Sequence, residues 1–301
     1  MVGALGNFLV NWLVFSALYA LTAIGFTIIF GVGGVLNLAH GASITISAFL
    51  TLIWFRTLRD AMADPVALLL AFVASLLVVA LFNGVLYLVF VRGLERVYDT
   101  AEQVALLVLI VTLLAALIVE QAFRLRFGSE HRSVPDFVGG VIPGTNVEMN
   151  LLLGFVVSWT IIGGIFLLVD RTKIGKALVA ASMSRRGAEI VGVDIKRLYI
   201  VTWVLAGVLA GIAGVFLGSF EGAQYTMGRN PLVISFAIVI LGGLGSIRGS
   251  VLGAYIIGLL EIGTTTFIDP NATGMMAFLV IVLVLLVRPE GLYGRELQVG
   301  E

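Results

Sequence analysis

The chain has 301 residues, of which 60% are hydrophobic and only 12% are charged, and its formal net charge at pH 7 is zero. The absence of cysteine excludes disulfides, thiolate metal sites and cysteine nucleophiles. Apolar runs of about twenty residues recur along the sequence, and each can span roughly 30 Å of hydrocarbon. We therefore predict an all-α polytopic membrane protein, a single transmembrane domain over residues 1–301 with about 8–9 transmembrane helices.

The first apolar run covers residues 8–30, and we expect it to be a retained span because no Lys or Arg precedes it. The next stretch, residues 31–41, reads GVGGVLNLAHG and places Asn37 and His40 inside an apolar run. Irregular backbone at membrane depth is tolerated only where it is buried in protein or lines a cavity. We predict a broken helix in which Asn37, His40 and Gly41 face a translocation pathway. The alternative is a tight turn with His40 hydrogen-bonded inside the bundle.

Two further spans are expected over residues 66–91 and 103–123. Glu120 lies near the end of the span at 103–123, and Arg124 follows four residues later, which favours a local ion pair on one helix face. Residues 124–150 contain several prolines and glycines, so we expect extended or turn structure in an external loop.

A fifth span, residues 151–169, leads into a basic loop over residues 170–197 that carries seven of the eighteen basic residues. Short loops rich in Lys and Arg stay in the cytoplasm, which places the N-terminus outside and the C-terminus inside if the chain crosses nine times. Apolar residues recur in the loop at helical spacing, which predicts a short amphipathic helix outside the membrane. The alternative is a solvated basic loop that only orients the chain.

The sixth span, residues 198–220, carries four glycines on one helical face, which allows close helix packing without implying a ligand. These glycines are Gly207, Gly211, Gly214 and Gly218.

A second glycine-rich interruption follows within residues 232–267 and resembles the first in composition. We align His40-Gly41 with Arg248-Gly249, an offset of 208 residues, and predict two broken helices in an internal repeat, with the pathway between the repeats. Glu261 is either a pathway residue or a buried helix–helix bond. The pathway residues predicted here are Gly242, Gly243, Gly245, Arg248 and Glu261. The last span covers residues 275–287.

Catalytic patterns are missing. The sequence has no phosphate-binding P-loop, no nucleophile elbow and only two histidines, His40 and His131, without metal-ligand spacing. We therefore expect a transport protein that is not an enzyme, with no metal site and no cofactor of its own.

Three stretches together resemble the LivH-type permease subunits of branched-chain amino acid ABC importers: VLNLAHGA at 35–42, the basic loop and following span at 177–214, and FAIVILGGLGSIRGSVLGAYIIGLLE at 236–261. Sugar permeases of the same superfamily typically carry an acidic D-L-S-x-G element where this chain has Asn37 to Gly41. The departure argues against a sugar as substrate.

The resemblance implies a plasma-membrane subunit that works with two ABC ATPase subunits, which bind ATP-Mg, and with an extracytoplasmic substrate-binding protein. The second permease would be a LivM-like chain or another copy, membrane lipids would surround the pair, and no nucleic acid is expected. The basic loop would be the coupling helix that docks on the ATPase. By position its contact residues would be Ala181, Arg185, Arg186, Ala188, Glu189, Gly192 and Val193.

Two alternatives stay open. Permeases for urea and short amides look much like this chain. A stand-alone secondary transporter would also use broken helices, with His40, Glu120 and Glu261 as proton or ion groups. An intramembrane enzyme would need a convergent catalytic set that the sequence does not show.

Overall fold

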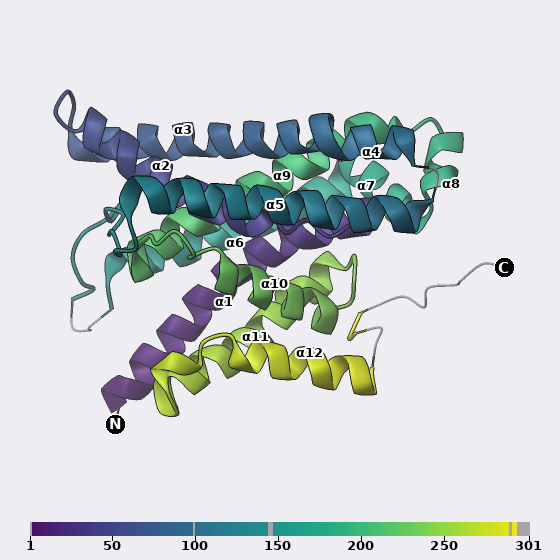
Figure 1. The fold of residues 1–301 in the computed structure, drawn as a ribbon. Helices are drawn as coiled ribbons and strands as arrows, with labels where there is room; N and C mark the ends of the chain where they lie inside the picture. The colour runs from purple at the N-terminus through teal and green to yellow at the C-terminus, as the bar shows by residue number, and fades with distance from the viewer. Residues whose placement is uncertain (1, 99, 144–146, 289–290, 294–301) are drawn as a thin grey trace.

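The computed structural model describes residues 2–98, 100–143, 147–288 and 291–293 (Figure 1). The elements run in chain order as α1 (Val2–Gly33), α2 (His40–Leu58), α3 (Asp64–Val85), the π-helix η1 (Leu86–Val91), α4 (Arg92–Val97), α5 (Ala101–Phe127), α6 (Met149–Arg171), α7 (Lys173–Met183), α8 (Arg185–Ile190), α9 (Ile195–Leu217), the π-helix η2 (Gly218–Gly222), α10 (Arg229–Gly242), α11 (Ile247–Phe267), the 3₁₀ helix η3 (Pro270–Ala272) and α12 (Met275–Val287).

Seven helical segments in the described ranges are long and apolar enough to cross a membrane. They are α1, α2, α3 continued through η1 and α4, α5, α6, α9 with the start of η2, and α11. Two shorter apolar helices, α10 and α12, have 14 and 13 residues. Helices dominate because every backbone polar group in hydrocarbon must be paired within its own segment. The predicted all-α polytopic fold is confirmed.

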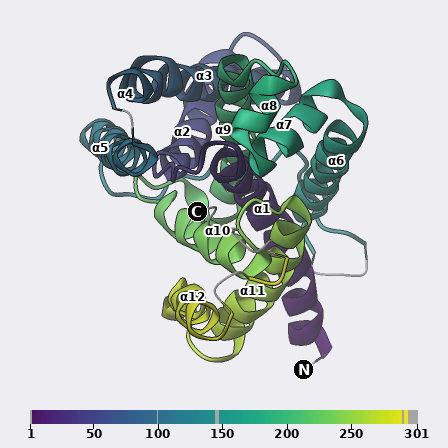
Figure 2. The same ribbon diagram turned by 90° about the vertical axis from the view of Figure 1, so that its right-hand side faces the viewer.

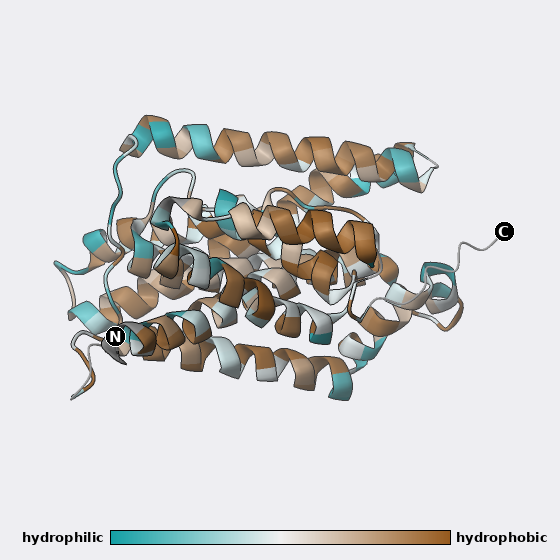
Figure 3. Cartoon of the chain, turned by 90° about the horizontal axis from the view of Figure 1, so that it is seen from below, coloured by the Kyte–Doolittle hydropathy of each residue, from teal (hydrophilic) through white to brown (hydrophobic). Residues whose placement is uncertain are grey.

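The helices form a centre and a periphery. In the end-on view of Figure 2, α1 and α9 lie in the middle and α3, α5, α6 and α12 lie around them. Of the most apolar stretch of α1, 89% is buried, against 11% of that of α5. Figure 3 shows the outer helices as hydrophobic in their middle and hydrophilic toward their ends. This pattern suits helices that face lipid or a partner within a membrane.

Small residues let the central helices approach closely. A Cβ on Gly214 would lie 2.4 Å from the Ile44 carbonyl oxygen of α2, and one on Gly207 would lie 2.2 Å from the Asn83 amide of α3. Gly211 and Gly218 likewise face Leu76 and Ala48. The three glycines of α9 and Gly218 at the start of η2 therefore lie against α2 and α3, and Asn83 donates a hydrogen bond to Ser43 Oγ at 2.9 Å across the same contact.

The two ends of the bundle differ. One end holds α4, α7, α8 and the segment 243–246, and the other holds the turn between α2 and α3 together with residues 128–143 (Figure 1). The predicted loop 124–150 begins as helix, since α5 continues to Phe127, and residues 144–146 of it lie outside the described residues.

Part of this loop enters the bundle. The backbones of Arg132 and Ala223 exchange two hydrogen bonds, and Val134 is fully buried beside α2. Asn150, at the start of α6, bonds both Asp136 and Ser219. The loop is thereby fixed to η2 and to the non-helical segment that follows it.

Candidate functional site

The first helix break lies between α1 and α2, at residues 34–39. Gly34 adopts a φ of +64°, which favours glycine, and the chain then turns back toward the interior. Asn37 Oδ1 accepts a hydrogen bond from the Ala39 amide at 3.0 Å, and the Leu38 amide donates to Thr112 Oγ1 of α5 at 3.1 Å. Side chains therefore replace the backbone bonds that a continuous helix would make.

His40 begins α2 and is completely buried. Its Nε2 lies 2.9 Å from the carbonyl oxygen of Thr22 in α1, and its ring packs edge-on against Phe26. Thr22 lies eleven residues before the end of α1, which at 1.5 Å per residue is about 16 Å along that helix. The histidine is therefore bonded inside the bundle, as in the second of the two alternatives, and α2 starts deep in the interior.

A second helix starts next to it. The carbonyl of Gly41 lies so close to Gly228, just before α10, that a Cβ on Gly228 would come within 1.9 Å of the carbonyl oxygen. Ser235 of α10 also donates a hydrogen bond to Thr22 Oγ1 at 2.6 Å. The N-terminal ends of α2 and α10, each carrying a partial positive charge, thus meet inside the bundle. A non-helical segment precedes each helix: 34–39 in one case and 223–228 in the other.

The second predicted break, at residues 243–246, has a different location. Gly243 adopts a φ of +98°, and Ser246 Oγ caps α11 by accepting a bond from the Gly249 amide. Gly245 lies against Gly31 near the end of α1, and Arg248 is exposed. The Arg248 position is therefore at an end of the bundle, whereas His40 is in its interior. His40 and Arg248, which the sequence alignment pairs, therefore do not occupy equivalent positions in the fold.

The remaining predicted pathway glycine of this stretch, Gly242, is a packing residue. A Cβ on it would lie 2.4 Å from the backbone of Gly249, and its carbonyl accepts a hydrogen bond from the Tyr293 amide. Close approach between α10 and α11 requires both glycines.

The predicted local ion pair of Glu120 is wrong. Its carboxylate accepts hydrogen bonds from Arg229 of α10, at 2.9 Å from Nε and 2.5 Å from Nη2. Arg124 instead lies over the ring of Tyr225, with 5.7 Å between its Cζ and the ring centroid. The ion pair joins residues 109 positions apart because Arg229, the first residue of α10, lies beside the C-terminal third of α5.

Glu261 is 1% exposed and accepts a hydrogen bond from the Gly274 amide at the start of α12. Of the two alternatives predicted for Glu261, a pathway residue or a buried bond between helices, the structure shows the buried bond. In the parts of the chain that the structure covers, no group of three or more His, Asp or Glu side chains is placed to hold a metal ion.

The basic loop folds into two short helices, α7 and α8. Hydroxyls cap both: Thr172 accepts from the Gly175 amide and Ser184 from the Gly187 amide. Arg185 lies 3.7 Å from Glu95 of α4 and extends over the ring of Tyr199 of α9. Arg185 therefore joins this loop to α4 and α9, and Leu178, Ala181 and Ala188 pack into the core of the bundle.

The residues predicted to contact an ATPase divide into two groups. The side chains of Ala181 and Ala188 are buried against the bundle, and Val193 is partly buried. The exposed members are Arg185, Arg186, Glu189 and Gly192.

Sequence reasoning missed the apolar side chains that the loop exposes. Ile190 is 79% exposed, Val191 75% and Met183 68%. The helical spacing places Met183 and Val191 on the apolar face of a single amphipathic helix and leaves out Ile190, so three apolar residues in a basic loop were the available signal. We name Met183, Arg186, Ile190 and Val191 the α7–α8 tip.

Comparison with known proteins agrees with this architecture. Residues 8–285 match the family model described as the permease component of branched-chain amino acid transport systems. The chain is 29% identical to the high-affinity branched-chain amino acid transport permease BraD of Pseudomonas aeruginosa, over 95% of each chain. It is 26% identical to LivH of Escherichia coli K12, over 95% of this chain and 94% of LivH.

A more distant similarity covers about half the chain. The ribose import permease RbsC of Bacillus subtilis is 28% identical over 49% of this chain and 46% of its own length. No solved structure matches the chain.

Proposed function

The chain belongs to the permease family of branched-chain amino acid ABC transport systems, and from this premise we propose that it forms half of the transmembrane passage of an importer for branched-chain amino acids. The other half would be a LivM-like permease or a second copy. Two ATPase subunits would drive transport, and an extracytoplasmic binding protein would deliver the substrate.

The observation that carries the proposal is the α7–α8 tip. Ile190, Val191 and Met183 are exposed apolar side chains in a short segment that also exposes Arg186, at one end of the bundle. A short helical element with this character suits docking into a groove on a partner. The lack of an ATP-binding motif in the chain means that the energy source must be such a partner.

A contact route leads from the tip toward the first break. Arg185, next to the tip, lies over Tyr199, whose hydroxyl donates a hydrogen bond to the Val32 carbonyl at 3.0 Å. Val32 immediately precedes the end of α1. In our proposal, ATP-driven closure of the ATPases moves α7 and α8, and this route transmits the movement to segment 34–39. ATP can drive the change only through its higher affinity for the closed state.

The basic loop at residues 170–197 determines the proposed orientation in the membrane. The end with α7 and α8 faces the cytoplasm, because Lys and Arg in short loops stay on that side. The N-terminus and residues 128–143 then face outward, where the binding protein docks. The C-terminal residues 294–301, which we place inside, lie outside the described residues.

The substrate path is proposed to run past the meeting point of α2 and α10. Segments 34–39 and 223–228 have irregular backbone inside the bundle, which suits a passage wall. Asn37 and His40 are buried in this conformation, so a passage beside them opens only when the helices move. The names of the relatives favour a branched-chain amino acid over urea, a short amide or an ion-coupled solute.

The test is co-purification of the wild type and of Arg186→Glu with candidate ATPase subunits, followed by ATP hydrolysis in proteoliposomes. We expect the charge reversal to remove the ATPases while the permease stays folded. Arg59→Glu is the matched control, an exposed arginine at the opposite end of the bundle. Equal retention of ATPases by Arg186→Glu and Arg59→Glu would contradict the docking role, and transport down an ion gradient without ATP would contradict the ABC assignment.

A further inference from the structure

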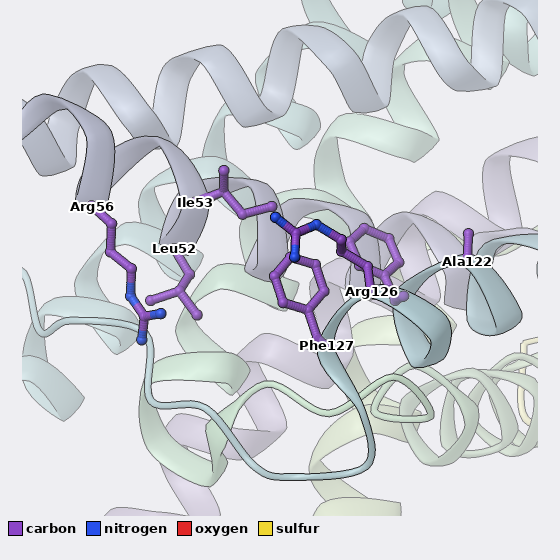
Figure 4. A pocket seen from close by; sticks show the side chains of 7 residues that line it. Leu52, Ile53, Arg56, Ala122, Arg126 and Phe127 are labelled. Atoms are coloured by element: carbon purple, nitrogen blue, oxygen red, sulfur yellow. The ribbon is translucent and has the colours of Figure 1, made fainter.

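A cavity of about 460 Å³ lies between the ends of α2 and α5, at the end of the bundle opposite the α7–α8 tip (Figure 4). Its floor is apolar and its mouth carries two arginines. The lining residues are Leu52, Ile53, Arg56, Ala122, Phe123, Arg126 and Phe127. A cavity of this size lies within the range of sites for small organic ligands, roughly 300–1,000 Å³.

The two arginines lack an anionic partner. Arg56 and Arg126 are exposed, both side chains extend into the space between α2 and α5, and neither forms an ion pair with a carboxylate among the residues that the structure describes. Arg126 touches only an aromatic face, with its Cζ 5.5 Å from the centroid of Phe127. The lining contains no acidic side chain. Two guanidinium groups without a carboxylate partner beside an apolar surface suit a ligand that is negative at one end and apolar at the other.

The location indicates the source of this ligand. Arg56 is two residues from the end of α2 and Arg126 is one residue from the end of α5. Both helices are apolar and end at this side of the bundle, which places their last turns at the depth of the lipid headgroups. Arg side chains at such positions extend toward the headgroup phosphates while their aliphatic stems stay against the apolar surface.

We propose that this cavity is a binding site for an anionic phospholipid. The phosphate accepts hydrogen bonds from Arg56 and Arg126, and an acyl chain lies against Leu52, Phe123 and Phe127. A bidentate guanidinium suits phosphate geometry better than an ammonium would. A zwitterionic amino acid fits less well, because nothing in the lining neutralises its ammonium group. The site is separate from the meeting point of α2 and α10 and does not depend on the proposed substrate.

The experiment measures phospholipid binding to the purified full chain in detergent by native mass spectrometry. The probes are phosphatidylglycerol and phosphatidylcholine with identical acyl chains. We expect phosphatidylglycerol to bind more tightly, and Arg56→Gln combined with Arg126→Gln to weaken it at least about tenfold, as expected when charge-assisted bonds are lost. Millimolar inorganic phosphate should not displace the lipid, because it cannot use the apolar floor.

The chain offers a matched control. Arg59 and Arg124 are exposed arginines near the ends of the same two helices, but each lies over a ring outside the cavity, Phe55 and Tyr225. Arg59→Gln with Arg124→Gln should leave phosphatidylglycerol binding unchanged. A further variant, Ala122→Trp, keeps both lining arginines and fills the floor, so it should also weaken the lipid.

Three results would overturn the proposal. One is equal binding of the two lipids, or equal loss in the control and in the lining double variant. Another is displacement of the lipid by inorganic phosphate, which would indicate a simple anion site. The third is an assembled complex in which side chains of a second permease occupy the cavity and exclude lipid. Thermal unfolding of each variant establishes that the compared proteins are folded.

Discussion

The segment 34–39 lies inside the bundle, and the segment 243–246 lies at its end, although both are glycine-rich interruptions of apolar helices. The first is held by polar side chains: Asn37 and Thr112 bond its amides, and buried His40 follows it. The second is held by a helix cap and by neighbouring backbone, and it touches α1 near Ser182 of α7. Segments of similar composition therefore form an interior break in one case and a turn at the end of the bundle in the other.

The two breaks differ in how easily their backbone can change conformation. Asn37 Nδ2 and His40 Nδ1 are already buried without a partner at the first break, and each further hydrogen bond lost in this low-dielectric interior would leave another unpaired buried group. A partly exposed break beside α7 can exchange its bonds with water. We infer that segment 243–246 adjusts when the proposed ATPase contact moves, whereas segment 34–39 moves only together with the helices around it.

The largest effect is expected at the contact that fixes the first break. Gly228→Val would place side-chain atoms into the backbone of Gly41, where even a Cβ would be 1.9 Å from an oxygen. Because backbone cannot move aside as a flexible side chain does, we expect a loss of about 3 kcal/mol or more in unfolding free energy. Thermal unfolding in detergent measures this loss. Gly163→Val in α6, where no atom lies within 4 Å of the added Cβ, should melt like the wild type. Similar melting of the two variants would contradict the close contact of α2 and α10.

A second prediction separates packing from chemistry at His40. Replacement by alanine removes a buried ring and its bond to Thr22, so His40→Ala should lose about 2–4 kcal/mol of stability. Transport per folded molecule should fall less than the yield does. His131→Ala, at the exposed second histidine, should leave both quantities unchanged. A stable His40→Ala protein with no transport would instead assign a direct role in the pathway to the histidine.

A smaller effect is expected at the second break. Ser246→Ala removes the hydroxyl that caps α11, which should cost about 1 kcal/mol. Unfolding in detergent measures the loss, and Ser182→Ala is the control, because its hydroxyl bonds only its own helix at Val179. If the second break is the adjustable one, Ser246→Ala should also change ATP hydrolysis in the assembled complex. If Ser246→Ala loses stability but hydrolyses ATP at the wild-type rate, the inference that the second break adjusts during transport is contradicted.

The sequence predicts what local pattern controls. Apolar length predicted the helices, and glycines with polar residues predicted the interruption at 34–39. The depth of a residue in the bundle and its partners on other helices could not be predicted from local pattern. Glu120 pairs with Arg229 across 109 residues, because α10 starts inside the bundle and places the arginine beside α5. The spacing rule that favoured Arg124 considers one helix in isolation.

The basic loop illustrates the same limit. Its charge and helical spacing predicted short helices outside the membrane, and α7 and α8 are such helices. The spacing could not predict that Ser184 separates them, since a cap and a change of direction at one residue reset the helical face. Ile190 and Val191 therefore face outward, and Ala181 and Ala188 face the bundle.

A loss of stability as small as that of Ser246→Ala is expected at Tyr199, and this variant tests whether α8 communicates with the first break. Tyr199→Phe removes one hydrogen bond to the Val32 carbonyl and should cost only about 1 kcal/mol. The ring remains, so its contact with Tyr87 and with Arg185 is kept. If this bond transmits movement from α8 to the first break, ATP hydrolysis should continue while amino acid uptake per ATP falls. Tyr255→Phe, which removes a hydroxyl bonded to Trp159 on the outer side of the bundle, is the control and should keep the wild-type ratio. An unchanged ratio in Tyr199→Phe would mean that the first break moves with the rigid helices around it and receives no signal through α9.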